Sequence, residues 1–159
     1  VRGDQVFAGY WRNDAANDSA FRDGWFLTGD IGRRDAEGFV TIVDRKKDMI
    51  VSGGENVYSR EVENLLYEHP AVAEVAVVGL PHPLWGEQVT AILRLRDGAP
   101  GDVAAELEAF CRPRIAGYKR PRRWVVVDAL PKTPAGKIQK AELRRRLLAD
   151  GTPETKEPR

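Results

Sequence analysis

The most informative stretch of this chain is Pro131-Lys132-Thr133-Pro134-Ala135-Gly136-Lys137-Ile138. Its prolines and Gly136 predict a turn, because proline fixes φ and glycine tolerates the left-handed region of backbone space. Such a turn would hold Lys137 at the tip of a loop, where an ammonium can neutralise charge developing on carboxylate and phosphate oxygens. Alone, the pattern is more typical of an ordinary surface lysine, so a functional interpretation of Lys137 depends on the motifs upstream.

Two further stretches contain candidate ligand-binding side chains: Gly24-Trp25-Phe26-Leu27-Thr28-Gly29-Asp30 and Asp44-Arg45-Lys46-Lys47-Asp48. Asp30 ends a strand-like run, and its carboxylate oxygens can accept both hydroxyl protons of a ribose diol. Arg45 puts a permanent charge at the end of another strand-like run, which suits a ribose or phosphate contact. Taken singly, these patterns are more often a turn and a solvated charged face.

The second stretch leads into Ser52-Gly53-Gly54-Glu55-Asn56. Two glycines let a ligand approach the backbone where a Cβ would collide, so Gly53, Gly54 and Glu55 are candidate ligand contacts. Taken alone, such a glycine pair marks a tight turn more often than a binding loop. It is not a Walker phosphate loop, because no Gly-Lys-Ser/Thr follows, and it is not a dinucleotide fingerprint.

Composition gives no global electrostatic argument for a nucleic-acid or membrane-surface partner. The 159 residues include 25 basic and 24 acidic side chains, for a net charge of +1. The length allows one ordinary domain, or a small domain with a piece of another. No apolar run approaches the roughly 20 residues of a bilayer span, so we expect no membrane span.

Histidine and cysteine usage predicts no metal site. His69 and His82 lack partners at metal-ligand spacing, and the single cysteine, Cys111, falls on the apolar face of an expected helix. One cysteine also excludes an internal disulfide framework and suits a reducing compartment, so we expect a cytoplasmic protein.

The hydrophobic pattern predicts an α+β fold in which helices flank a small mixed sheet, preceded by a β-hairpin. The hairpin should pair residues 25–34 with 39–44, and Ser59 should cap a helix with Val62, Leu65 and Leu66 on one face. The other elements are expected at strands 73–80 and 88–95 separated by a proline-containing loop at 81–87, a helix from Asp102 to Pro113, strand 124–128 and helix 141–148.

Two basic clusters support an alternative, a non-catalytic module that binds nucleotide or RNA. Basic residues interleaved with aromatic residues can bind single-stranded nucleic acid. The balanced total charge makes this the minority interpretation, and a pocket for a phosphorylated ligand explains the clusters equally well. We expect no nucleic-acid partner. The clusters are Lys119, Arg120, Arg122 and Arg123 beside Tyr118 and Trp124, and Lys137, Lys140, Arg144, Arg145 and Arg146.

Taken together and in this order, the motifs resemble the acyl-CoA synthetases of the adenylate-forming superfamily, which also contains firefly-type luciferases and amino-acid-adenylating domains. The resemblance runs from Val1 to about Leu148. Ser59 departs from it, because many relatives have proline there. The motifs that carry the resemblance are Gly9-Tyr10-Trp11, residues 24–30, residues 44–48, residues 53–58 with Glu61-Val62-Glu63, Gly86-Glu87-Gln88, Tyr118-Lys119-Arg120-Pro121 and residues 131–137.

The resemblance implies a two-step reaction in which a carboxylic acid and ATP give an acyl-adenylate and pyrophosphate, after which the thiol of CoA displaces AMP. It implies that Asp30 and Arg45 contact the ribose of the nucleotide. Lys137 would bridge the substrate carboxylate and the nucleotide. The resemblance further implies a hinge at Lys47 and, after a domain swing, an approach of the CoA pantetheine to Gly53, Gly54 and Glu55.

The resemblance also implies a domain organisation. Residues 1–46 would be the last portion of a large N-terminal domain, residues 47–148 a mobile C-terminal domain, and residues 149–159 a disordered tail. The phosphate loop, acyl pocket and magnesium-binding carboxylate would lie in the rest of the N-terminal domain, so we expect this chain alone to be inactive. The motifs favour an acyl- or aryl-CoA ligase acting on a fatty or aromatic acid, with a luciferase-like or amino-acid-adenylating relative as the alternative.

Overall fold

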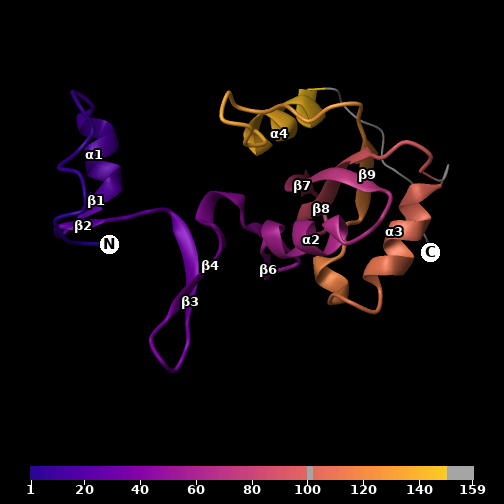
Figure 1. The fold of residues 1–159 in the computed structure, drawn as a ribbon, viewed down its shortest axis with the longest axis horizontal. Helices are drawn as coiled ribbons and strands as arrows, with labels where there is room; N and C mark the ends of the chain where they lie inside the picture. Colours follow the sequence, from indigo (N-terminus) through magenta and orange to yellow (C-terminus); the bar gives the residue numbers. More distant parts are fainter. Residues whose placement is uncertain (100–101, 150–159) are drawn as a thin grey trace. The chain divides into compact units, whose positions relative to one another are not determined.

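The computed structural model describes residues 1–99 and 102–149 (Figure 1). The chain divides into a first compact unit, Val1–Lys47, and a second that begins at Asp48. Of the tail predicted for residues 149–159, Ala149 is the last residue of helix α4, and the remainder lies outside the described residues.

The first unit contains a short helix and two small antiparallel ladders. Helix α1 (Asp14–Ala20) begins after Asn13, whose side chain accepts a hydrogen bond from the Ala16 backbone N–H. The ladders pair β1 (Phe21–Arg22) with β2 (Trp25–Phe26), and β3 (Asp30–Arg34) with β4 (Val40–Arg45). The predicted hairpin is therefore present, but the expectation that its first strand begins at residue 25 is wrong, because Gly29 adopts a φ of 73° and ends the run.

The first unit has little core of its own. Among residues 1–47, all of which the structure describes, Asp44 is the one buried residue. The Phe7 ring makes edge contacts with Tyr10, Phe21 and Phe26, yet Trp11 is 85% exposed. The first unit therefore leaves several large apolar side chains exposed.

The second unit is built on a mixed sheet. Its strands are β5 (Ile50–Ser52), β6 (Glu55–Val57), β7 (Val72–His82), β8 (Gly86–Leu95) and β9 (Arg123–Val126). Within the described residues the order is β6-β5-β8-β7, and β9 pairs with β8 in the parallel direction. This arrangement confirms the predicted α+β class.

The longest ladder joins β7 and β8, whose register extends from Val72↔Leu95 to His82↔Gly86. The predicted loop at residues 81–87 is therefore too long, because Pro81 and His82 belong to β7. A proline is tolerated here because β7 lies at the edge of the sheet, where one side of the strand needs no ladder hydrogen bonds.

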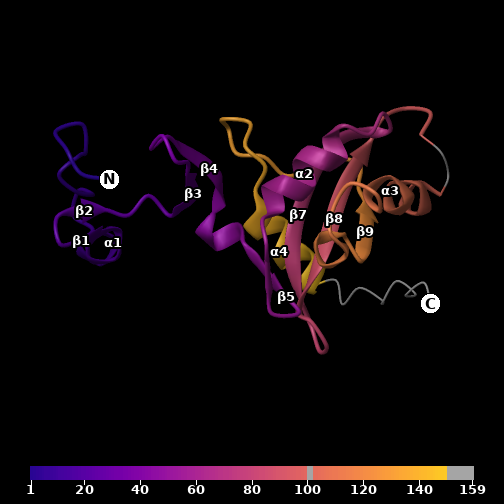
Figure 2. The ribbon, with the colours of Figure 1, turned by 90° about the horizontal axis from the view of Figure 1, so that it is seen from below.

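Helices cover both faces of the sheet (Figures 1 and 2). Helices α2 (Ser59–Tyr67) and α3 (Val103–Cys111) contribute Val62, Leu66 and Leu107 to one buried cluster, and α4 (Lys140–Ala149) contributes Leu143 to the other. The predicted helix faces are therefore confirmed. Two short 3-10 helices, η1 (Lys46–Asp48) and η2 (Gly117–Lys119), connect these elements.

The predicted cap at Ser59 is wrong, whereas the helix that was predicted to open at Asp102 is present and Asp102 caps it. The Asp102 side chain accepts from the Ala105 backbone N–H, but Tyr58 is the residue that precedes α2, and no side chain caps it. Ser59 is the first residue of α2 and is fully buried, and its hydroxyl accepts from the Lys140 ammonium at 2.7 Å. The Ser59 hydroxyl, which the local sequence pattern predicted to cap the helix backbone, therefore takes part in a tertiary contact with Lys140.

The different burial of two leucines predicts that their substitution will change the free energy of unfolding by very different amounts. Leu66 is fully buried and Leu84 is 71% exposed. We expect Leu66→Ala to lower the free energy of unfolding by about 2–5 kcal/mol, because it removes apolar burial and leaves a cavity. Leu84→Ala should change it by less than about 0.5 kcal/mol. Urea unfolding of both variants measures the difference, and equal losses would contradict this description of the core.

Candidate functional site

Asp30 and Arg45, the predicted ribose contacts, meet at the open end of the β3–β4 hairpin. They are directly opposite each other in the ladder, and the Arg45 Nε donates to Asp30 Oδ1 at 2.8 Å. The Asp30 backbone N–H donates to the Thr28 hydroxyl, and the Arg45 backbone N–H donates to Asp44 Oδ1. Both side chains are partly exposed, at 24% for Asp30 and 56% for Arg45, so polar groups of a ligand can reach them.

Lys47 lies in the short connection between the two units. It belongs to η1, which links the end of β4 to the start of β5, and the division between the units falls immediately after it. A short 3-10 segment has few backbone hydrogen bonds and can absorb a change of φ and ψ more readily than a strand.

Gly53 and Gly54 form the turn between β5 and β6, and both adopt positive φ, at 60° and 85°. Their surroundings differ. A Cβ on Gly53 would lie 3.2 Å from the Trp85 ring, whereas one on Gly54 would meet no atom within 4 Å. The missing side chain of Gly53 thus makes room for Trp85, and only Gly54 presents bare backbone to open space, followed by exposed Glu55.

Trp85 is a site residue that sequence reasoning missed. Its backbone carbonyl accepts from the Gly53 N–H at 2.8 Å, and the Arg122 guanidinium lies 4.0 Å from its ring centroid. Within the described residues, its buried indole Nε1–H has no hydrogen-bond partner. A tryptophan beside Gly86 in a strand-to-strand turn was the available signal, but nothing local indicated that it would pack on a glycine so far upstream.

Lys137 is held at the tip of an ordered loop. The Thr133 backbone N–H donates to the Lys137 carbonyl, the Gly136 N–H donates to the Thr133 carbonyl, and the Lys137 N–H donates to the Thr133 hydroxyl. Gly136 has a φ of 78°, as the predicted turn requires. The Lys137 side chain is exposed, and its ammonium has no ion pair or hydrogen bond within residues 1–99 and 102–149.

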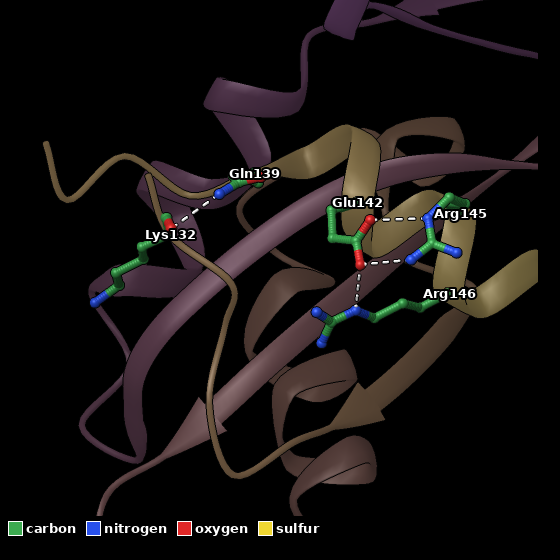
Figure 3. A network of polar contacts seen from close by, with 5 residues as sticks. All are labelled: Lys132, Gln139, Glu142, Arg145 and Arg146. Carbon is green, nitrogen blue, oxygen red and sulfur yellow. Dashed lines mark hydrogen bonds and ion pairs between the residues drawn. The ribbon is translucent and has the colours of Figure 1, made fainter. Parts of the chain in front are cut away.

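The base of this loop is closed by a second set of contacts. Lys132 and Ile138 form an isolated antiparallel bridge, and the Gln139 backbone N–H donates to the Pro131 carbonyl at 2.8 Å. Figure 3 shows the Gln139 side-chain amide reaching the Lys132 carbonyl, at 2.9 Å. We call residues 131–139 the lysine loop.

The lysine loop and the glycine turn lie at opposite ends of the second unit. Figure 2 shows the turn between β5 and β6 beside the turn between β7 and β8, while the loop that leads into α4 projects from the other end. The second unit therefore presents two separate candidate surfaces, one around Gly54 and Trp85 and one around Lys137.

The histidines and the cysteine have structural roles in the described part of the chain. His69 Nδ1 accepts from the Ala71 N–H, and His82 Nδ1 accepts from the N–H groups of Leu84 and Trp85. Burial raises the pKa of the Cys111 thiol to about 11, which keeps it protonated and unreactive. Among the described residues, no group of three histidine, cysteine, aspartate or glutamate side chains could hold a metal ion.

Residues 61–137 match the family model described as the AMP-binding enzyme C-terminal domain. Over 152 residues the chain is 49% identical to a long-chain-fatty-acid–CoA ligase of Bacillus subtilis, an alignment that covers 96% of this chain and 26% of that enzyme. It is also 49% identical over 145 residues to a 2-succinylbenzoate–CoA ligase of Geobacillus kaustophilus, covering 91% of this chain and 29% of the relative.

The chain is also similar to solved structures of longer proteins. The o-succinylbenzoate CoA synthetase of Bacillus subtilis, in complex with an acyl-adenylate intermediate, superimposes with a TM-score of 0.82 at 39% identity, covering 99% of this chain and 30% of that one. An ATP-bound structure of MatB from Rhodopseudomonas palustris gives 0.80 at 41% identity, covering 89% and 28%. The chain thus spans less than a third of the length of these relatives. No helix in the described part has the length and apolar composition of a membrane span.

The packing of Trp85 on Gly53 predicts unequal effects of two neighbouring substitutions. Alanine at either glycine costs about 1–2 kcal/mol, because both positions have positive φ. Gly53→Ala should destabilise the chain more than Gly54→Ala, since its new Cβ must displace the Trp85 ring. Urea unfolding followed by tryptophan fluorescence measures both losses. Equal losses would show that Trp85 does not pack against Gly53.

Proposed function

Since residues 61–137 belong to the C-terminal domain family of AMP-binding enzymes, we propose that this chain is the C-terminal part of an AMP-forming ligase that joins a fatty or aromatic carboxylic acid to CoA. The observation that carries the proposal is the exposed, unpaired Lys137 ammonium at the tip of an ordered loop, within the described residues. The names of the relatives support the acid–CoA ligase class, and their acids differ from one to the next.

In the first step, a carboxylate oxygen of the acid attacks the α-phosphorus of ATP, and the bond to pyrophosphate breaks. Negative charge builds up on the oxygens around the phosphorus, and the Lys137 ammonium stabilises it as a point charge. Asp30 and Arg45 hold the ribose of the nucleotide. The magnesium ion expected with ATP is assigned to the N-terminal part of the parent enzyme.

In the second step, the sulfur of CoA attacks the acyl carbonyl carbon, the thiol proton is released, and AMP leaves. Gly54 and Glu55 line the approach of the pantetheine, where bare backbone faces open space. Gly53 contributes through the packing of Trp85. Because the lysine loop and the glycine turn lie at opposite ends of the second unit, presenting first one and then the other to a bound adenylate requires a rotation, which we assign to Lys47.

The first unit fits the last portion of a large N-terminal domain. Its exposed Trp11, Phe39 and Ile42 and its lack of buried apolar residues support a partner surface supplied by the rest of that domain. The parent enzyme is the setting in which acid, ATP and CoA meet. We place it in the cytoplasm, because a single cysteine suits a reducing compartment.

The basic clusters favour this proposal over an RNA-binding module. Most of their side chains are paired with acidic or aromatic partners, so little unpaired positive charge remains for a phosphate backbone. The pairs are Lys119 with Glu61, Arg120 with Glu108, Arg122 with Trp85, Lys140 with Glu63, Arg144 with Glu87, and Arg145 and Arg146 with Glu142.

We expect the 159-residue chain alone to catalyse no acid-dependent exchange between ATP and pyrophosphate. The physical reason is that less than a third of the length of the relatives is present, without the domain to which the phosphate loop and acyl pocket are assigned. Exchange assays with radiolabelled pyrophosphate and a panel of fatty and aromatic acids measure this. Exchange above the no-acid background would contradict the assignment.

In the full-length enzyme, Lys137→Ala should slow adenylate formation by about 100-fold or more, because the developing charge loses its counter-ion. Thioester formation from supplied acyl-adenylate and CoA should stay within about 3-fold of wild type, because Lys137 does not act in that step. Separate single-turnover assays measure the two steps.

Arg145→Ala is the matched control, since Arg145 is exposed, lies in the same segment and contacts Glu142 rather than the lysine loop. It should leave both steps unchanged. An equal loss of both steps in Lys137→Ala would refute the role given to Lys137.

A further inference from the structure

Two lysines other than Lys137, one at each end of the lysine loop, attach the loop to the rest of the second unit. At its start, the Lys132 ammonium pairs with the Glu74 carboxylate on β7. Just beyond its end, the Lys140 ammonium pairs with Glu63 on α2 at 2.7 Å and donates to the Ser59 hydroxyl at 2.7 Å. Two of the three lysines in this segment are therefore committed to carboxylates, whereas Lys137 between them is not.

The Lys140 attachment is the less exposed of the two. Its side chain is 19% exposed and that of Glu63 is 14% exposed, so salt screens the pair less than a surface pair. Glu63 Oε1 also accepts from the Val77 backbone N–H at 2.8 Å. A single carboxylate thus joins the first residue of α4 to α2 and to the edge strand β7.

The Lys132 attachment is also part of a network. Glu74 accepts from the Arg94 Nε on the neighbouring strand at 3.2 Å. The hydrogen bond from Lys132 is the main reason that the pKa of Glu74 lies below its usual value, with Arg94 adding to the effect against desolvation. The carboxylate is accordingly ionised, and available to Lys132, throughout the neutral pH range.

Fixing both ends of a short loop removes most of its conformational freedom. The bridge of Lys132 with Ile138 and the hydrogen bonds of Gln139 close the base, and the hydrogen bonds of Thr133 order the tip. The freedom left to Lys137 is then that of its own side chain. An ammonium delivered by a rotating domain needs this restriction, because misplacement by about 1 Å can cost on the order of 100-fold in rate.

We propose that Lys140, together with Lys132, is a positioning residue that sets where Lys137 is presented for adenylate formation. The ion pairs of Lys140 with Glu63 and of Lys132 with Glu74 hold the lysine loop in a fixed position relative to the sheet. The catalytic part of this inference rests on the proposed function, whereas the ordering of the loop does not.

The outer face of α4 supplies a matched control. Glu142 pairs with both Arg145 and Arg146, as Figure 3 shows. The hydrogen bond from Arg145, and to a smaller extent the one from Arg146, lowers the pKa of Glu142 to about 2. Arg145 is 69% exposed and its pair stays within α4. Removing it deletes a cation from the same helix without releasing the lysine loop.

The ordering is tested in the chain itself by amide hydrogen exchange at Gly136 and Lys137. In Lys140→Met the two amides should exchange about 10-fold faster or more, because the loop opens more often, and Lys132→Met should give a smaller increase. Lys140→Arg should restore wild-type exchange, and Arg145→Met should leave it unchanged. Unchanged exchange in both Lys140→Met and Lys132→Met overturns the proposal. If Lys140→Met does not fold, unchanged exchange in Lys132→Met alone overturns it.

The positioning role is tested in the full-length enzyme with the same variants. Lys140→Met should lower the rate of adenylate formation about 10- to 100-fold at saturating substrates, whereas thioester formation from supplied acyl-adenylate should persist and Lys140→Arg should recover the first step. Equal loss of both steps, as expected for a merely structural residue, overturns the proposal. If the wild-type enzyme forms no adenylate, the proposed function fails, and the exchange measurement still decides whether Lys140 and Lys132 order the loop.

Discussion

The second unit depends on the long antiparallel pairing of β7 with β8, because both faces of that ribbon are apolar and both must be covered. Val75, Val77 and Val89 face one buried cluster, and Val78 and Ile92 face the other. Helices α2 and α3 cover the first face, which leaves the second to α4. The need to bury that second face is what brings the end of the chain, and the loop preceding it, back against the sheet.

Helix α4 covers its face with little apolar surface. Leu143 is its one buried residue within the described range, so ionic contacts supplement packing. Arg144 pairs with Glu87 at 2.9 Å, and Glu87 also accepts from the Val51 N–H of β5. Gly79 makes this possible, because a Cβ there would lie 2.8 Å from the Glu87 carboxyl carbon. Carboxylates that serve both a helix and the sheet backbone therefore fix a helix whose hydrophobic contribution is small.

The sequence pattern predicted features that depend on neighbouring residues and missed features that depend on residues far away in the chain. Runs of β-branched and apolar residues predicted strands β7 and β8, and proline and glycine predicted the Lys137 turn, since each depends on a few neighbouring residues. Ser59 was assigned to a helix cap because its distant partner, Lys140, is invisible to a local window. Pro81 was excluded from the sheet because edge position depends on strand order. Helix α1 was missed because it buries no residue and so carries no apolar stripe.

The candidate site shows the same division between local and distant information. The motif around residues 131–138 indicated that Lys137 would stand on a turn, but it contains Lys132 as well, and Lys140 follows closely. Nothing in the segment distinguishes the three lysines chemically. Distant carboxylates make the distinction, because Glu74 and Glu63 take up Lys132 and Lys140 while no described residue takes up Lys137. A chain with nearly equal numbers of acidic and basic residues can thus leave one ammonium unpaired within the described residues by pairing the neighbouring lysines.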